Sequence, residues 1–192
     1  MARPQSIDEP ELIARLSRVF RDVGYEGASL TMLERASGLK KASLYHRFPG
    51  GKAQMAEEVL RASKVWMEMN VFTPLKGSGT PTQRLAAVAR NLDAFYSGGR
   101  QACLLNMLAA PHSGSGAFSA AIKTALKALI GAFEALAREA GCSPAVSAAR
   151  AERTVMLLHG SLVLSRGLNS RDPFQNFLQS LPGELLGDRK SR

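Results

Sequence analysis

Apolar residues recur at intervals of three and four positions along nearly all of the 192-residue chain. This spacing places apolar side chains along one face of an α-helix, where they can pack against a neighbouring helix. Runs that alternate between apolar and polar residues, which would indicate β-strands, are absent from the sequence. The pattern therefore predicts an all-α protein.

Glycines, prolines and polar stretches divide this pattern into separate helices. The second helix begins at Ser29 or Thr31, since either hydroxyl can cap a helix and Glu34 could complete a capping box with Thr31. It ends at Gly38. Other helices are expected over residues 12–23, 41–48, 52–69, 85–96, 102–110, 118–136, 144–164 and 172–181. Residues 73–81 and 112–116 are expected to form loops, because they are rich in glycine, proline and serine.

The charge of the chain points to a polyanionic partner. Lysine and arginine number 25 against 16 aspartates and glutamates, which gives a net charge of +9 and a pI near 10.1. Between Arg35 and Ala56 there is no acidic residue, whereas five basic residues fall in that window: Arg35, Lys40, Lys41, Arg47 and Lys52. Such a basic stretch is typical of nucleic-acid binding, although general solubility is an alternative explanation.

Several classes of protein are disfavoured by the sequence. No window approaches 18 uninterrupted apolar residues, so we expect no membrane-spanning helix and no membrane partner. The N-terminal residues are polar and lack the apolar core of a signal peptide. Cys103 and Cys142 alone cannot build a disulfide framework. These features together predict a cytoplasmic protein.

The two short helices around Gly38 have the pattern of a helix-turn-helix, whose second helix enters the major groove of DNA. Glycine suits the turn because it adopts a positive φ without strain. Four apolar side chains would hold the two helices together: Leu33, Ala36, Leu39 and Leu44. The other face of the second helix carries Lys41, Ala42, Ser43, Tyr45, His46 and Arg47. Small residues allow close approach to bases, and the others can donate hydrogen bonds to guanine or phosphate.

These residues carry a resemblance to a known family. The segment 38–48, GLKKASLYHRF, closely resembles the recognition segment of the TetR family of bacterial transcriptional regulators. Residues 49–52, PGGK, and 103–106, CLLN, resemble its LmrA/YxaF-type branch. The resemblance is continuous from about Leu12 to Leu60, and beyond that stretch it is mainly architectural.

The resemblance implies DNA-binding roles for a set of residues. Lys41, Ala42 and Ser43 would face bases or nearby phosphates, whereas Tyr45 and His46 would grip the DNA backbone. The full set expected at the DNA is Ser29, Thr31, Lys40, Lys41, Ala42, Ser43, Tyr45, His46 and Lys52. Lys52 would contact a phosphate. Lys40 departs from the usual serine or threonine cap of the recognition helix. A solvated basic helix, a core position for Tyr45 and an exposed His46 without a partner are the alternatives.

The resemblance also implies a dimeric repressor that a ligand releases from a pseudo-palindromic operator. Residues 1–66 would form the DNA-binding domain and 67–192 the effector and dimerisation domain. A lipophilic or aromatic effector would contact Trp66, Met69, Phe72, Phe95, Met107, Phe118 and Met156, each of which could equally be a core residue. The stretch 155–164 is apolar nearly all round, which indicates burial against another subunit. The expected dimer contacts are Leu157, Gly160, Ser161, Leu164, Phe174 and Phe177.

An all-helical enzyme or a plain lipophilic-ligand-binding protein is the alternative function. Cys103 could pair with His112 or His159 as nucleophile and base, but no glycine-rich elbow or oxyanion motif accompanies them. Cys103 lies in an apolar run, which favours a small buried side chain over a thiol sensor. Cysteines and histidines lie too far apart to suggest a metal site. We therefore expect no enzyme activity, no metal and no cofactor.

Overall fold

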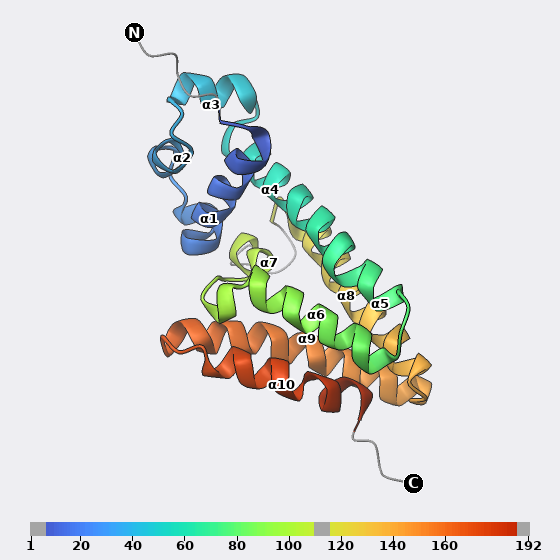
Figure 1. The fold of residues 1–192 in the computed structure, drawn as a ribbon. Helices are drawn as coiled ribbons and strands as arrows, with labels where there is room; N and C mark the ends of the chain where they lie inside the picture. Colours follow the sequence, from blue (N-terminus) through green and yellow to red (C-terminus); the bar gives the residue numbers. More distant parts are fainter. Residues whose placement is uncertain (1–6, 110–115, 188–192) are drawn as a thin grey trace. The chain divides into compact units, whose positions relative to one another are not determined.

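A computed structural model of the chain describes residues 7–109 and 116–187, and all of its regular elements are helical (Figure 1). This confirms the all-α prediction. The chain forms two compact units: Met1–Lys64 with Leu104–Phe118, and Val65–Cys103 with Ser119–Arg192. Residues 104–109 and 116–118 thus group with the first unit by their contacts, whereas the functional division at residue 66 stays a prediction. No helix in the described part of the chain is long and apolar enough to cross a membrane.

The first unit contains four helices and the start of a fifth. They are α1 (Glu9–Gly27), α2 (Leu30–Ser37), α3 (Lys41–Arg47), α7 (Leu104–Leu108) and the first part of α4 (Gly51–Met67). Asp8 caps α1, because its carboxylate accepts a hydrogen bond from the backbone N–H of Glu11 at 2.9 Å. The fully buried side chains at the centre of this unit are Leu12, Leu16, Phe20, Leu33, Leu44 and Met55.

Helix α1 continues past its expected end at Gly24. Gly24 has a φ of +74°, and helical structure resumes beyond this kink as far as Gly27. A side chain at Gly24 would place its Cβ 3.1 Å from the carbonyl oxygen of Met107. Glycine is therefore needed both for the backbone conformation and for the close approach of α7.

The second unit contains the remainder of the helices. After α4 come η1, a π-helical turn (Glu68–Phe72), α5 (Thr73–Lys76), α6 (Pro81–Phe95), η2 (Ser97–Gly99), α8 (Ser119–Glu139), α9 (Pro144–Gly167) and α10 (Asp172–Leu186). Helix α9 packs along both α8 and α10 (Figure 1). Ser143 caps α9 as predicted, since its hydroxyl accepts from the N–H of Val146 at 3.4 Å. The core of this unit includes Leu85, Leu92, Phe133, Leu136 and Phe174.

Two expected boundaries in this unit are wrong. Residues 73–76 were expected in a loop, but they form α5, where Pro74 is tolerated because it lies in the first turn. The loop starts at Gly77, and a reciprocal capping box between Thr80 and Gln83 begins α6. Helix α10 passes the expected end at residue 181, continues through Pro182 and stops at Leu186 before Gly187, whose φ is +82°.

Candidate nucleic-acid interface

The backbone around Gly38 forms the helix-turn-helix that the sequence predicts. Ser29 is the cap of α2, because its hydroxyl accepts from the N–H of Met32 at 3.3 Å. Thr31 lies inside the helix, and Glu34 therefore does not complete a capping box with it. Gly38 has a φ of +72°, and its N–H donates to the carbonyl oxygen of Glu34 at 2.9 Å. This left-handed residue ends α2 and redirects the chain toward α3.

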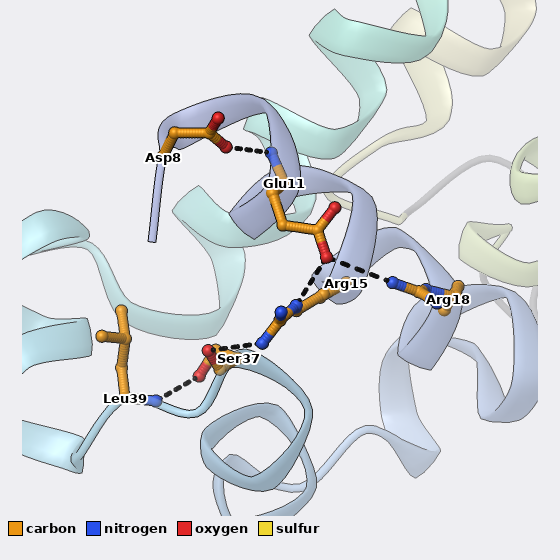
Figure 2. Close-up of polar contacts among 6 residues, drawn as sticks. All are labelled: Asp8, Glu11, Arg15, Arg18, Ser37 and Leu39. Atoms are coloured by element: carbon orange, nitrogen blue, oxygen red, sulfur yellow. Dashed lines mark hydrogen bonds and ion pairs between the residues drawn. The ribbon is translucent and has the colours of Figure 1, made fainter. Parts of the chain in front are cut away.

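A polar network joins α1 to this turn (Figure 2). The Nε of Arg15 donates to the carboxylate of Glu11 at 2.7 Å, and Nη1 donates to the carbonyl oxygen of Ser37 at 3.5 Å. Ser37 is almost fully buried, and its hydroxyl accepts from the N–H of Leu39 at 3.2 Å. A single network thus connects the first turn of α1, the end of α2 and Leu39 in the turn before α3. No sequence pattern pointed to Glu11, Arg15 or Ser37, whereas Leu39 was expected only as an apolar contact between α2 and α3.

Helix α3 buries one side and exposes the rest. Leu44 is buried against the unit's core. The exposed residues are Lys41, Ala42, Ser43, Tyr45, His46 and Arg47. Tyr45 is 39% exposed, which excludes the alternative that it is a core aromatic. The Nζ of Lys41 lies 6.0 Å from the centroid of the Tyr45 ring.

Both ends of α3 show how the helix is held. Lys40 occupies the cap position and makes no side-chain capping hydrogen bond, in agreement with its departure from serine or threonine. At the other end, the Nη1 of Arg47 donates to the carbonyl oxygen of Ile7 at 3.3 Å. Arg47 therefore ties the end of α3 to the residues that precede α1.

Lys52, the second residue of α4, is half-buried, unlike the exposed residues of α3. Its Nζ donates to the carbonyl oxygen of Tyr25 at 2.9 Å and lies 4.4 Å from the centroid of that ring. The Tyr25 ring also meets Phe118 edge-on, with 5.0 Å between their centroids. Burial raises the pKa of Tyr25 above its ordinary value, and the nearby carboxylates of Glu26 and Glu57 raise it further.

The expected effector contacts divide between the two units. Met107 and Phe118 belong to the first unit, where Phe118 is buried against Tyr25. In the second unit, Trp66 and Phe95 stack with 3.8 Å between their ring centroids. The half-buried Phe72 belongs to the same unit. Two further members of the expected set, Met69 and Met156, are mainly exposed.

The expected dimer contacts also separate into two groups. Phe174 and Phe177 are buried in the core of their own unit, and Ser161 is buried with its hydroxyl donating to the carbonyl oxygen of Leu158 at 2.9 Å. Leu157 is half-buried, whereas Gly160 and Leu164 are exposed. The exposed apolar side chains of α9 are Val146 (42%), Met156 (61%), Val163 (60%) and Leu164 (55%).

Two of the residues considered for other chemistry, Cys103 and His159, lie in the second unit. Cys103 is buried, and His112 lies outside the described residues. Burial lowers the pKa of His159 below its ordinary value. Within residues 7–109 and 116–187, no three histidine, cysteine or carboxylate side chains come together to hold a metal ion.

The fold and this surface define a DNA-binding protein of the helix-turn-helix class. A family model for "Bacterial regulatory proteins, tetR family" matches residues 12–59, which span α1 to α4. The HTH-type transcriptional regulator LmrA of Bacillus subtilis is 27% identical over 91% of this chain and 95% of its own length. The chain therefore resembles the TetR family over its DNA-binding region and resembles LmrA over most of its length.

Solved structures show the same fold. A TetR transcriptional regulator from Legionella pneumophila superimposes with a TM-score of 0.79 over 95% of this chain and all of that chain, at 16% identity. AibR, solved in complex with isovaleryl coenzyme A and operator DNA, has a TM-score of 0.60 over 92% of this chain and 96% of its own, also at 16% identity. The likeness to both extends through the second unit as well as the helix-turn-helix.

Proposed function

We propose that this protein is a TetR-family regulator that binds a pseudo-palindromic operator as a homodimer and releases it when a small molecule binds the second unit. The observation that carries the proposal is the exposed basic and polar face of α3, which follows a well-formed helix-turn-helix turn. A regulator of this kind acts on the chromosome, and we therefore also propose a cytoplasmic location.

We expect the exposed residues of α3 to contact different parts of the DNA. Ala42 and Ser43 are small enough to let the helix approach base edges, and the Nζ of Lys41 can donate to the acceptors of guanine. Tyr45 and His46 lie further along the helix and can donate to phosphate oxygens. Ser29, Thr31 and Lys40 would contact phosphates near the starts of α2 and α3.

The exposed face of α9 supports the homodimer. Met156, Gly160, Val163 and Leu164 follow helical spacing on one side of α9, and the three large apolar members are each more than half exposed. An apolar stripe of this kind on a long helix is typical of an interface between subunits. A two-fold pairing would present two copies of α3 to successive major-groove segments.

The effector of this protein is proposed to be a lipophilic or aromatic molecule. AibR was solved with both isovaleryl coenzyme A and operator DNA, which supports ligand control of DNA binding in proteins of this fold. In this chain the stacked pair Trp66 and Phe95 offers aromatic surface in the second unit. A ligand that favours one conformation of the dimer would change the affinity of the dimer for its operator. The size of this change is set by the ratio of the ligand's affinities for the two conformations.

The test is binding of the purified protein to the DNA beside its own gene, measured by fluorescence anisotropy against an unrelated duplex of the same length. We expect the upstream DNA to be preferred by about a thousandfold or more at physiological salt. Equal binding to both duplexes would contradict an operator-specific regulator. Failure to bind either duplex at low salt would contradict DNA binding itself.

A further inference from the structure

The ammonium group of Lys52 is engaged inside the first unit. It donates to the carbonyl oxygen of Tyr25 at 2.9 Å, and Tyr25 lies in the last turn of α1. The same Nζ lies 4.4 Å from the centroid of the Tyr25 ring, within range of a cation–π interaction. Lys52 is half-buried, in contrast to Lys41 on the exposed face of α3.

The first turn of α4 in turn supports the recognition helix α3. Gly51 precedes Lys52, has a φ of +64° and donates its N–H to the carbonyl oxygen of Phe48 at 2.8 Å. The ring of Tyr45, from α3, lies over Gly51, and its Cε1 is 3.4 Å from the position that a Cβ of residue 51 would take. The start of α4 therefore touches α3 through Tyr45 and is anchored to α1 through Lys52.

From these contacts we propose that Lys52 is a positioning residue for DNA binding. It fixes the first turn of α4 against the end of α1, and it thereby sets the position of Tyr45 and of the C-terminal part of α3. In this role the ammonium group of Lys52 interacts within the protein and does not contact a DNA phosphate. The inference rests on the proposed DNA-binding function.

The two roles of Lys52 differ in their dependence on salt. Each phosphate contact that a protein loses lowers the slope of log affinity against log salt by about 0.9. We would measure this slope for wild type, Lys52→Met and Lys40→Met on a non-specific 30-base-pair duplex, sized at about three helical turns. We expect Lys52→Met to bind several-fold more weakly with an unchanged slope. Lys40→Met, the matched control of equal charge at an exposed position proposed to contact a phosphate, should lower the slope. Circular dichroism would confirm that each variant is folded.

A double-mutant cycle then links the effect to Tyr25. If Lys52 acts through Tyr25, the combination of Lys52→Met with Tyr25→Leu will weaken binding by less than the product of the single effects, with a coupling of about twofold or more. Lys40→Met combined with Tyr25→Leu will show independent effects. Lys52→Arg, which keeps the cation, should recover part of the lost affinity.

Three outcomes would overturn the inference: a slope that falls by about one unit in Lys52→Met, independent effects of Lys52 and Tyr25, or an unchanged affinity. Should Tyr25→Leu fail to fold, the slope of Lys52→Met decides alone. A wild-type protein that does not bind the duplex at low salt would instead contradict the proposed function.

Discussion

The guanidinium of Arg15, in α1, donates to the carbonyl oxygen of Ser37, the last residue of α2, at 3.5 Å. Most of α1 and α2 lies between these two residues in the chain, so this contact joins α1 to the end of α2 (Figure 2). Ser37 then bonds to the N–H of Leu39. The orientation of α3 therefore depends in part on a side chain that does not itself belong to the helix-turn-helix.

Replacement of Arg15 by methionine should loosen this turn and weaken DNA binding. The side chain is partly exposed, so we expect a modest loss, of about two- to fivefold, equivalent to a single hydrogen bond of ordinary net strength. Arg18→Met is the matched control, because Arg18 lies on the same helix, carries the same charge and contacts only Glu11, at 3.7 Å, among the ion pairs of the described residues. Equal losses in the two variants would show that charge, and not the contact with Ser37, is responsible.

Gly38→Ala should lower the free energy of unfolding through backbone strain alone. A φ of +72° costs an alanine roughly 1–2 kcal/mol. The new Cβ would not clash, because its nearest neighbour, the Nη1 of Arg15, lies 3.7 Å away. Gly131→Ala is the control, because this helical glycine of α8 has open space around its Cβ position. There alanine should stabilise by about 0.5–1 kcal/mol. Chemical denaturation measures both, and a stable Gly38→Ala would contradict the role of the turn.

Lys41→Ala and His46→Ala should affect DNA binding in different ways. If Lys41 donates to a guanine, its loss should reduce the preference for the operator by roughly 1–3 kcal/mol. His46→Ala should weaken binding to all sequences alike, because a phosphate contact carries no base information. Anisotropy titrations on operator and unrelated DNA separate the two effects. Unchanged binding in both variants would contradict the assignment of α3 as the recognition helix.

Leu164→Asp should dissociate the dimer without unfolding the subunit. Leu164 is exposed within the single chain, so the carboxylate costs little there, but at a two-fold interface two desolvated carboxylates would cost several kcal/mol. Leu162, which is 1% exposed, is the contrasting position, and Leu162→Asp should unfold the second unit itself. Light scattering after size exclusion, together with circular dichroism, distinguishes these results. A wild-type monomer at micromolar concentration would contradict the dimer.

The stability of the second unit should fall as the pH drops, because of His159. Burial lowers the pKa of this imidazole in the folded state, so the unfolded chain takes up the proton first. The contribution of His159 to the free energy of unfolding should therefore be constant above about pH 6.5 and should decrease below that pH. His159→Gln should flatten this dependence. Thermal unfolding across this range provides the measurement, and identical pH profiles in wild type and His159→Gln would contradict the prediction.

Local signals made much of the fold predictable. The turn at Gly38 and the start of α9 at Ser143 depend on residues a few positions apart, and the structure confirms both. The proline signals were less reliable, because Pro74 lies in a first turn and Pro182 is accommodated inside α10. Whether a helix tolerates proline depends on its surroundings, which periodicity does not report.

The supports of the recognition helix could not be predicted from the sequence. Arg15 and Ser37 are 22 positions apart, and Lys52 and Tyr25 are 27 apart, so no local pattern links either pair. The grouping of Met107 and Phe118 with the first unit depends on contacts with Gly24 and Tyr25, respectively, that are much more distant in sequence. The exposed face of α3 was predictable, because helical spacing alone places Leu44 on the buried side and the polar residues around it on the other side.

Footprinting of the protein on the DNA upstream of its gene tests the central claim most directly. Two copies of α3 on a two-fold dimer should protect two half-sites whose centres lie about 10 base pairs, or a multiple of that distance, apart. Lys41→Ala should weaken protection in both half-sites equally. Protection of a single half-site, or none at concentrations that saturate non-specific DNA, would contradict the account of this protein as a dimeric operator-binding regulator.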